Sequence, residues 1–292
     1  MARDPSSMRL VLISRGCTSA SAKLLRAAAE ARGVAVEVVA ADTAVFDLRP
    51  LESVGTMLYR TSIDPQDRLL EQALQSPDVA SCRNTLTSIY GYYNKMCQAS
   101  LLQEQGVPVA KTCFTRSTAR AELEQVIERL GLPVVIKVFP GTLGVGVGRV
   151  DSYISLKTMA EILVARGIDF VYQEFVAAAE GRQRRVVVLE GRAIACYENR
   201  LIEADEFRTN AVDGVSERVA VAAVEPELEA IAVAAAEALG LGFAGIDVLP
   251  YGPGAWVVAE VNFPFNFGLA QAATSVDIAG MLIDALSARA LR

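Results

Sequence analysis

Hydrophobic positions in the first third of the chain follow the periods of strands and helices in turn. Near-continuous apolar runs predict buried strands, and the segment between the first two has helical spacing and closes on Gly33. A strand–helix–strand opening of this kind predicts a parallel sheet with helices on its faces. The predicted strands are 8–16, 34–41 and 55–62, and the predicted helices are 19–33 and 65–76. We expect residues 1–8 to form a disordered extension.

The rest of the chain mixes helical periods with alternating strands. Two segments predict hairpins, one turning at Glu190-Gly191 and the other within PYGPG. The predicted hairpins are 184–200 and 243–262, single strands lie around Lys137 and at 170–176, and helices lie at about 91–105, 119–131, 155–166, 226–240 and 276–290. The predicted fold class is therefore α/β with added antiparallel sheet (α+β).

Length and composition describe an ordinary globular protein. The chain has 292 residues, of which 52% are hydrophobic and 21% charged, enough for two or three subdomains. No apolar run approaches the roughly 20 residues that span a bilayer, and the first ten residues lack the apolar core of a signal peptide. The formal net charge of −6 disfavours nucleic acid, because phosphate backbones bind basic surfaces. We expect neither a membrane nor a nucleic-acid partner.

Two residue types limit the chemistry. The five cysteines show no CxxC spacing, which predicts reduced thiols in a cytoplasmic protein and argues against zinc sites and disulfides. Histidine is absent, which excludes Ser-His-Asp and Cys-His catalysis and most zinc chemistry. Proton transfer must then use carboxylates, lysine, water or the substrates.

The second hairpin carries the most informative acids. If it is symmetric about Pro253-Gly254, Asp247 lies opposite Glu260 with Cβ atoms about 5 Å apart. Carboxylates at that distance repel unless a cation lies between them, and Asn262 adds a neutral oxygen one pleat further on. These oxygens suit a hard ion such as Mg²⁺; the alternative is a structural hairpin whose acids face solvent. The predicted common face holds Trp256, Val258, Glu260 and Asn262.

Four glycines in eight positions follow the apolar strand that carries Lys137. GTLGVGVGR lacks the Lys-Ser/Thr of a Walker A loop, and no GxGxxG joins a strand to a helix here. A glycine-rich hairpin remains, whose bare amides can approach phosphate oxygens and which can open as a lid. Lys137 would give such phosphates a counter-charge. The alternative is a flexible surface hairpin with a snorkelling lysine.

Three further segments have both a functional and an ordinary interpretation. Lys95 lies near the start of its helix, where the helix dipole disfavours a cation unless a phosphate binds; otherwise it is an exposed lysine. VYQEFV is an ordinary buried strand, which the local pattern favours, or an adenine-binding connector using the main chain of Glu174 and Val176. In EFRTN, Arg208 and Asn210 form a polar segment suited to anions.

Together these segments resemble the ATP-grasp superfamily, and within it the RimK-type amide ligases. The resemblance runs from about residue 84 to the C-terminus, and the N-terminal 80 residues fit only as a βα domain. The motifs are NKMCQASLLQEQGVPV, PVVIKVFPGTLGVGV, YQEFVAAAEGRQRR, EFRTNA and AAAEALGLGFAGIDVLP…VVAEVN…VDIAGMLIDAL. The implied ATP-grasp fold divides into a disordered extension (1–8), an N-terminal α/β domain (9–90), a central subdomain with a glycine lid (91–172) and a C-terminal antiparallel subdomain with a metal site (173–292).

The resemblance also implies roles for individual residues. For ATP it implies Lys95 and Lys137, the lid residues Gly141, Thr142, Gly144, Val145 and Gly146, the connector residues Gln173, Glu174, Phe175 and Val176, and Glu180 or Gln183 at the ribose. As catalytic residues, Arg185 and Arg208 would hold substrate or acyl-phosphate oxygens, with Asn210 beside the phosphates. Asp247, Glu260 and Asn262 would bind Mg²⁺, or Mn²⁺ in its place.

The chain departs from the family pattern in three places. After Asn262 it has FPFNFG where the family usually shows Ser-Ser-Pro-Gly, Gln183 stands where many relatives carry an acid, and Asp213 replaces an arginine. We therefore expect an acceptor pocket different from that of the glutamate-adding enzymes.

The resemblance implies an ATP-dependent carboxylate–amine ligase that acts on an amino acid or peptide through an acyl phosphate and releases ADP and phosphate. Such catalysis uses positioning and charge stabilisation, and needs no histidine. Family habit adds a homo-oligomer, a dimer or tetramer. The alternatives are a macrocyclising ligase on a ribosomal peptide or a modifier of protein tails, a synapsin-like ATP-binding module without turnover, and a Rossmann-type oxidoreductase.

Overall fold

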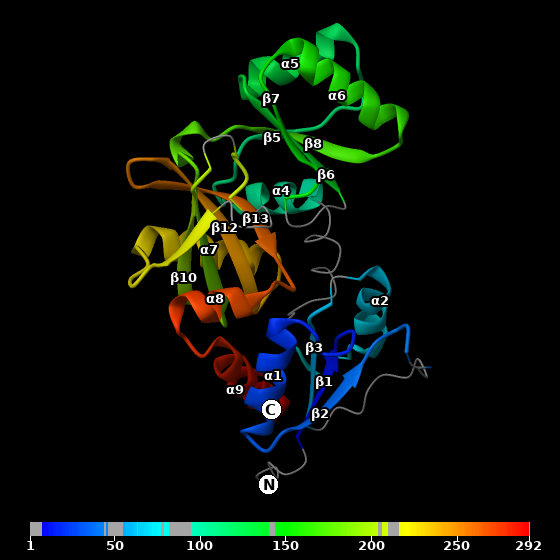
Figure 1. The fold of residues 1–292 in the computed structure, drawn as a ribbon, viewed down its shortest axis with the longest axis vertical. Helices are drawn as coiled ribbons and strands as arrows, with labels where there is room; N and C mark the ends of the chain where they lie inside the picture. Colours follow the sequence, from blue (N-terminus) through cyan, green and yellow to red (C-terminus); the bar gives the residue numbers. More distant parts are fainter. Residues whose placement is uncertain are drawn as a thin grey trace.

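The computed structural model describes most of the chain apart from its ends and several loops (Figure 1). The described residues are 8–43, 45, 55–62, 64–76, 79–81, 95–139, 144–203, 206–209 and 216–291. They form three β-sheets, each with its own helices. Within these ranges no helix combines the length and the apolar character needed to cross a membrane.

The first sheet is parallel and has the strand order β2-β1-β3-β4, which confirms the prediction from the opening pattern. Its elements are β1 (Arg9–Ile13), α1 (Ala20–Glu30), β2 (Ala35–Val39), β3 (Thr56–Arg60), α2 (Pro65–Leu74) and β4 (Ala80–Ser81). Helix α1 begins where the Ser19 side chain accepts a hydrogen bond from the Ala22 N–H, and it buries Leu25 and Ala29 in the core.

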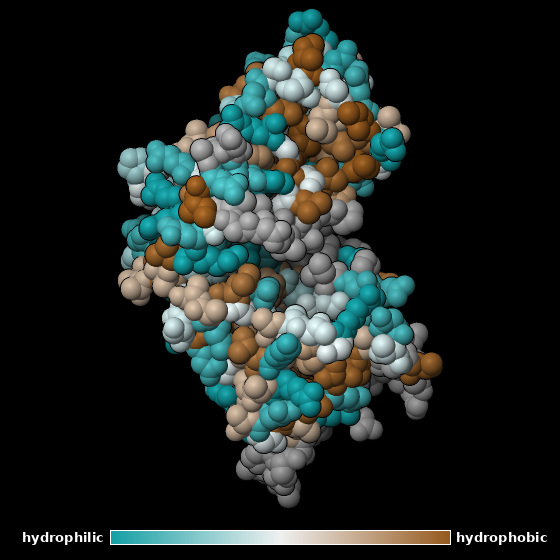
Figure 2. Space-filling view, viewed as in Figure 1, coloured by the Kyte–Doolittle hydropathy of each residue, from teal (hydrophilic) through white to brown (hydrophobic). Residues whose placement is uncertain are grey.

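The second sheet forms the upper lobe in Figure 1 and has the order β5-β8-β6-β7. Its elements are β5 (Thr112–Cys113), α5 (Arg120–Leu130), β6 (Val134–Phe139), β7 (Val147–Val150), α6 (Tyr153–Ala165) and β8 (Asp169–Glu174). Strands β6 and β7 pair antiparallel with Lys137 opposite Val147, so the predicted glycine-rich hairpin is confirmed. Leu123 of α5 and Leu156 of α6 pack against this sheet. Figure 2 shows that hydrophobic residues also reach the surface of this lobe.

The third sheet is antiparallel, with the order β11-β10-β9-β12-β13. Its elements are β9 (Arg182–Leu189), β10 (Arg192–Leu201), β11 (Ser216–Ala220), α7 (Pro226–Ala238), β12 (Phe243–Gly252) and β13 (Ala255–Asn262), and α4 (Lys95–Glu104) packs on β13. Both predicted hairpins are confirmed. The first turns at Glu190 and Gly191, whose φ angles of 49° and 73° lie in the left-handed region.

The end of the chain returns to the first sheet. Helices α8 (Phe267–Thr274) and α9 (Ile278–Ala290) both pack against α1. The phenylalanines of FPFNFG are buried and join the sheets: Phe263 meets the Tyr59 ring at 5.9 Å, and Phe265 meets the Phe243 ring at 5.2 Å. These aromatic side chains therefore lie in the core and pack the first sheet against the third.

Some expectations about the fold are wrong or incomplete. The boundary expected after residue 172 cuts through β8, which belongs wholly to the second sheet. Strand β11 and helix α8 are absent from the expected elements, because SERVA is short and largely exposed and α8 begins inside a Phe- and Pro-rich run. Of the cysteines, Cys17, Cys97, Cys113 and Cys196 are free thiols, as predicted, and Cys82 lies outside the described residues.

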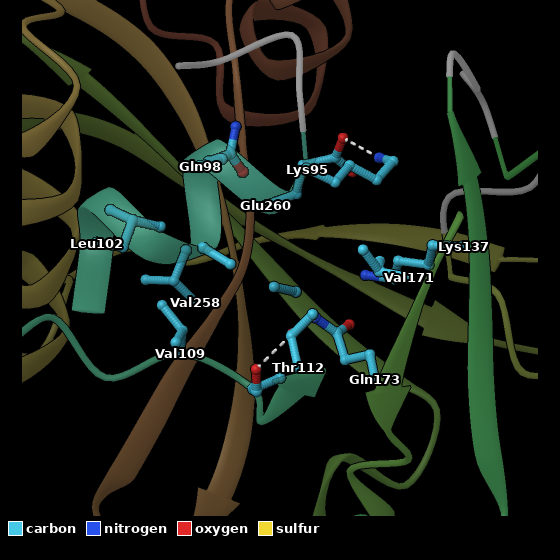
Figure 3. Close-up of a pocket in the computed structure, with 13 residues that line it drawn as sticks. Lys95, Gln98, Leu102, Val109, Thr112, Lys137, Val171, Gln173, Val258 and Glu260 are labelled. Atoms are coloured by element: carbon cyan, nitrogen blue, oxygen red, sulfur yellow. Dashed lines mark hydrogen bonds and ion pairs between the residues drawn. The ribbon is translucent and has the colours of Figure 1, made fainter. Parts of the chain in front are cut away.

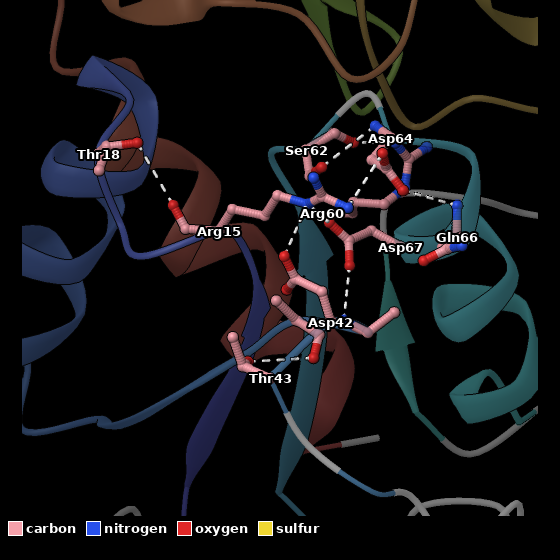
Figure 4. Close-up of polar contacts among 11 residues, drawn as sticks. Arg15, Thr18, Asp42, Thr43, Arg60, Ser62, Asp64, Gln66 and Asp67 are labelled. Carbon is pink, nitrogen blue, oxygen red and sulfur yellow. Dashed lines mark hydrogen bonds and ion pairs between the residues drawn. The ribbon is translucent and has the colours of Figure 1, made fainter.

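A buried charge network lies at the carboxyl ends of β1 and β3 (Figure 4). The Arg60 side chain is 0% exposed; its Nε donates to Glu71 Oε2 at 2.8 Å, and its Nη1 donates to the Ser62 carbonyl. Arg15 is closer to solvent and lies 3.5 Å from the buried carboxylate of Asp67. The Arg60–Glu71 pair fixes α2 against β3 from inside the domain.

Candidate functional site

A cleft of about 510 Å³ opens between the second and third sheets. Strands β6, β7 and β8 form one wall and strands β9, β12 and β13 the other, with the segment 206–209 at the mouth. A much smaller cavity of about 20 Å³ continues from it beneath α4 (Figure 3). Lys95, Lys137, Gln173 and Glu260 line both spaces. The structure therefore brings together residues that are far apart in the sequence.

The predicted pairing of acids on the second hairpin is confirmed. Asp247 of β12 lies directly opposite Glu260 of β13. The predicted common face is wrong in part, because the register shifts between Asp247 and Val248 and Ala259 becomes the extra residue of a β-bulge. Trp256 consequently lies on the far face, where its ring lies 4.6 Å from the Arg184 guanidinium, and Val258 joins the main core.

Each of these two carboxylates has its own cation. Arg185 Nε and Nη2 donate to Asp247 Oδ1 and Oδ2 at 2.6 and 2.5 Å, and Lys95 Nζ donates to Glu260 Oε1 at 2.7 Å. Burial alone would raise the pKa of Glu260, but Lys95 and Lys137 lower it below its ordinary value. Glu260 is therefore an ionised carboxylate on the floor of the cleft.

Glu260, Asp247 and Asn262 carry oxygens of the kind that a hard divalent cation binds, although both Asp247 oxygens already accept hydrogen bonds from Arg185 and Asn262 does not line the cleft. Asn262 Nδ2 donates to Asp247 Oδ2 at 3.0 Å, which turns its amide oxygen away from that carboxylate. Glu260 Oε2 and Asn262 Oδ1 accept no hydrogen bond from any described residue. The described residues contain no group of three or more Asp, Glu, Cys or His side chains that could hold a metal ion, so the donors are two carboxylates and an amide.

Lys137 is a buried cation without a countercharge of its own. Burial lowers the pKa of Lys137 to about 8, against a smaller opposing effect of Glu260. It makes no hydrogen bond or ion pair with any described residue. The charged form of a lysine held this way is stabilised by contact with an anion. The sequence predicted this role, as a counter-charge for phosphates.

The glycine turn adjoins this lysine. Gly144 and Gly146 have φ angles of 75° and 78°, and a Cβ on Gly146 would come within 3.0 Å of the Val138 side chain. Val145, between them, is 70% exposed. The predicted lid residues Gly141 and Thr142 lie outside the described residues.

The connector after β8 offers backbone groups to the cleft. The Glu174 N–H donates to the Lys111 carbonyl, and its carboxylate accepts from the Lys111 N–H at 2.7 Å and the Tyr251 hydroxyl at 3.2 Å. The Glu174 N–H is therefore not available to a base. The Val176 N–H has no partner among the described residues, and the Phe175 ring lies beneath the Arg149 guanidinium at 5.0 Å.

Residues proposed for the ribose and the acyl phosphate lie at the mouth. Glu180 has a φ of 48° and lies 3.6 Å from Arg182 in an exposed pair. Gln183 is buried; its Oε1 accepts from Thr209 Oγ1 at 2.5 Å, and its Nε2 has no partner among the described residues. Arg208 Nη1 donates to the Gly144 carbonyl at 3.2 Å. Asn210 and Asp213 lie outside the described residues.

Neither Gln98 nor Glu206 was predicted from the sequence to be a site residue. Gln98 Nε2 donates to the Val261 carbonyl at 2.9 Å and its Oε1 accepts from the Val261 N–H at 2.8 Å, so α4 is clamped to the edge of β13. Lys95 lies one turn earlier on the same helix, and the clamp sets its reach to Glu260. Spacing of three residues between Lys95 and Gln98 is the one local signal that places them on one helix face.

The chain belongs to the RimK-like ATP-grasp family, whose domain model matches residues 93–286. It is 30% identical to a protein of Rhodopirellula baltica named probable alpha-L-glutamate ligase, over 97% of this chain and 71% of that protein. A protein of the same name from Sodalis glossinidius is 31% identical, over 97% of this chain and 98% of its own length. The chain is thus an ATP-grasp ligase.

Solved structures have the same fold. The ATP-grasp ligase PsnB complexed with a minimal precursor matches with a TM-score of 0.74 and 18% identity, over 97% of this chain and 99% of that one. D-alanine–D-alanine ligase from Bacillus anthracis matches with a TM-score of 0.71 and 15% identity, over 98% of each chain. At these identities the likeness concerns the fold alone, and it confirms the expected ATP-grasp architecture.

Proposed function

We propose that this ligase joins a carboxylate to the amine of an amino acid or peptide at the expense of ATP. The observation that carries the proposal is the cleft of about 510 Å³, on whose floor Glu260 and Asp247 lie opposite each other and Lys137 makes no hydrogen bond or ion pair with a described residue. Opposed charges held apart in this way suit a metal–triphosphate complex, which supplies both the cation and the anion.

The chain's residues divide between binding and catalysis. Val176 N–H and the Glu174 carbonyl meet the base edge, Glu180 and Gln183 face the ribose, and Lys95 and Lys137 contact the phosphates. Asp247, Glu260 and Asn262 hold Mg²⁺, or Mn²⁺, which would neutralise the phosphate charge. Lys95 can serve the phosphates only after its bond to Glu260 is loosened, so we expect it to move when nucleotide binds.

The reaction proceeds in two displacements. A substrate carboxylate oxygen attacks the γ-phosphorus, the bond to the β,γ-bridging oxygen breaks, and ADP leaves. A neutral amine then attacks the acyl carbon, phosphate leaves with the C–O electron pair, and the amine loses its proton to water or to the departing phosphate. Arg208 stabilises the oxyanion of the tetrahedral state, and Arg185, which does not line the cleft, orients Asp247 through its two hydrogen bonds.

The substrate class follows the relatives more than the local geometry. Proteins named alpha-L-glutamate ligase are 30% and 31% identical to this chain, so L-glutamate is the first candidate to test. A peptide substrate is the second candidate, because the PsnB structures contain a precursor peptide in the same fold. The expected homo-oligomer remains a prediction that light scattering would test.

A phosphate-release screen tests the proposal. Purified protein, Mg²⁺ and ATP are combined with pairs of amino acids and short peptides, and ADP, phosphate and the product mass are measured. We expect stoichiometric ADP and amide with at least one pair, and loss of turnover by at least about 100-fold in Glu260→Ala.

The matched control is Glu203→Ala, because Glu203 lines the same cleft and its side chain makes no hydrogen bond or ion pair with any described residue. This variant is expected to keep turnover. Full turnover in Glu260→Ala would refute the site, and binding of ATP without turnover on any pair would favour the non-catalytic alternative.

A further inference from the structure

The carboxylate of Glu206, which is outside the predicted site, binds Arg208 at the mouth of the cleft. Glu206 Oε1 accepts from the backbone N–H groups of Phe207 and Arg208, both at 2.8 Å. The Glu206 carboxylate also accepts three hydrogen bonds from the Arg208 guanidinium, from Nε to Oε1 at 3.0 Å and to Oε2 at 3.2 Å, and from Nη2 to Oε2 at 2.6 Å. One side chain thus fixes both the backbone turn and the direction of the arginine.

The geometry of the pair leaves one edge of the guanidinium facing the cleft. Glu206 takes the Nε–Nη2 edge, and Nη1 on the opposite side donates to the Gly144 carbonyl of the glycine turn at 3.2 Å. The side chain of Glu206 is 13% exposed and that of Arg208 is 36% exposed, so the carboxylate lies behind and the guanidinium in front. The hydrogen bond to Arg208 lowers the pKa of Glu206 to about 2, and the pair stays charged at neutral pH.

Aromatic contacts also join the segment 206–209 to Phe175 of the connector after β8. Phe207, between the two charged residues, meets the Phe175 ring at 6.3 Å, and Phe175 lies under Arg149 of β7 at 5.0 Å. The segment 206–209 therefore touches the glycine hairpin at two places, at Gly144 through Arg208 and at Arg149 through the two rings.

We propose that Glu206 is a positioning residue that holds Arg208 in one orientation, in which the guanidinium is shared between the glycine turn and the reacting oxygens. A free arginine samples many rotamers, and ordering it during the reaction would cost side-chain entropy. Glu206 removes that cost before substrate arrives. The proposal rests on the proposed function for its effect on turnover, but its effect on the glycine turn is independent of that function.

A double-mutant cycle tests it with Glu206→Gln, Arg208→Ala and the combined variant. Glutamine keeps an oxygen for the two backbone N–H groups and removes the charged two-point contact. Turnover is measured as ADP release with Mg²⁺, ATP and the best pair from the screen, and hydrogen exchange of residues 144–150 is measured in the nucleotide-free protein. The control is Glu203→Gln, an acid of the same cleft whose side chain makes no hydrogen bond or ion pair with any described residue.

We expect Glu206→Gln to slow turnover about tenfold and to raise exchange at 144–150 roughly three- to tenfold, with no change in Glu203→Gln. In the Arg208→Ala background, Glu206→Gln should have no further effect on either quantity, because it acts through Arg208. Additive losses, or unchanged exchange and turnover in Glu206→Gln, would overturn the proposal.

Two further outcomes are separable. If Glu206→Gln does not fold, Glu206→Asp, which keeps the charge but cannot span both contacts, replaces it in the same cycle with the same expected directions. If the wild-type protein releases no ADP with any pair, the proposed function fails, and the exchange measurement alone still decides the role of Glu206.

Discussion

Two charged networks of this protein differ in burial and in completeness: the side chains of Arg60 and Glu71 are 0% and 2% exposed, and those of Lys95 and Glu260 in the cleft are 16% and 33% exposed. In the first sheet, Arg60 and Glu71 are nearly inaccessible to solvent and meet each other at 2.8 Å, and Arg60 also donates to the Ser62 carbonyl. In the cleft, Lys137 has no partner among the described residues, and neither does the Gln183 amide nitrogen. The Arg60–Glu71 pair is closed, although Asp67 Oδ2 beside it accepts no hydrogen bond from a described residue and lies 3.5 Å from Arg15; the cleft network ends in polar groups that line a cavity.

This difference distinguishes a network that stabilises the fold from one that is available to bind a ligand. A buried polar group without a partner costs folding free energy, so native proteins pair nearly all of them. Groups left open inside a cleft therefore indicate a ligand that completes them. Charge by itself would not have told the two networks apart, because both contain a basic side chain among acids.

The largest expected effect comes from opening the closed network. Arg60→Met leaves Glu71 as a buried charge without its cation, so we expect the free energy of unfolding to fall by about 3–5 kcal/mol. Urea unfolding followed by circular dichroism measures it. Arg26→Met serves as the control, because Arg26 and its partner Glu30 are both more than half exposed and the free energy of unfolding should hardly change. Equal effects of the two variants would contradict the distinction.

Removing the charge of Lys137 from the cleft network should have the opposite effect on the free energy of unfolding. Lys137→Met removes a desolvated charge from the nucleotide-free protein, so the free energy of unfolding should stay the same or rise. Affinity for Mg²⁺–ADP should fall roughly 100-fold, because a charge-assisted contact to phosphate is lost. Titration calorimetry and urea unfolding measure the two effects. A parallel loss of stability and affinity would mean that Lys137 is structural.

The clamp between α4 and β13 sharpens the comparison. Its own hydrogen bonds are complete, and it positions Lys95 in the cleft network. Gln98→Leu leaves the Val261 N–H and carbonyl without their partner, which should cost about 1–3 kcal/mol of stability. Nucleotide affinity should fall about tenfold as Lys95 loses its position. The same two assays apply, with Ser100→Ala on the exposed side of α4 as a control that should change neither.

The smallest effect is a pH dependence in which stability and nucleotide affinity change in opposite directions. The pKa of Lys137 is lowered in the folded protein from 10.5 to about 8, so between these values the unfolded chain binds more protons and stability rises with pH. Nucleotide affinity should fall over the same range, by several-fold from pH 7 to 9, because phosphate binding needs the charged amine. Calorimetry at four pH values tests the second sign, and both signs should disappear in Lys137→Met.

The sequence allowed most of the candidate site to be predicted where residues are local or follow a regular period. Alternation and a symmetric turn were enough to place Asp247 opposite Glu260, and the glycine spacing was enough for the hairpin after Lys137. The same reasoning misplaced Trp256 and Val258, because a bulge adds one residue to a strand without leaving a mark in the hydrophobic pattern.

Other features depend on residues that meet only in three dimensions. Glu206 and Arg208 are close in the chain, but their proposed role depends on the hydrogen bond from Arg208 to the carbonyl of Gly144, more than sixty residues earlier. The phenylalanines of FPFNFG are core residues, with Phe263 on Tyr59 of the first sheet and Phe265 and Phe267 on Phe243, and the expected difference in the acceptor pocket stays a prediction. Spacing within a motif carries no information about such distant partners.

By itself the sequence determined the kinds of element, the parallel first sheet, the paired acids and the absence of histidine chemistry, because these follow from local periods and from composition. Only the tertiary structure decided which cations pair with which carboxylates and which groups stay open toward the cleft. The physical reason is that burial and pairing are properties of the packed chain, since both depend on which distant side chains exclude water from the same place.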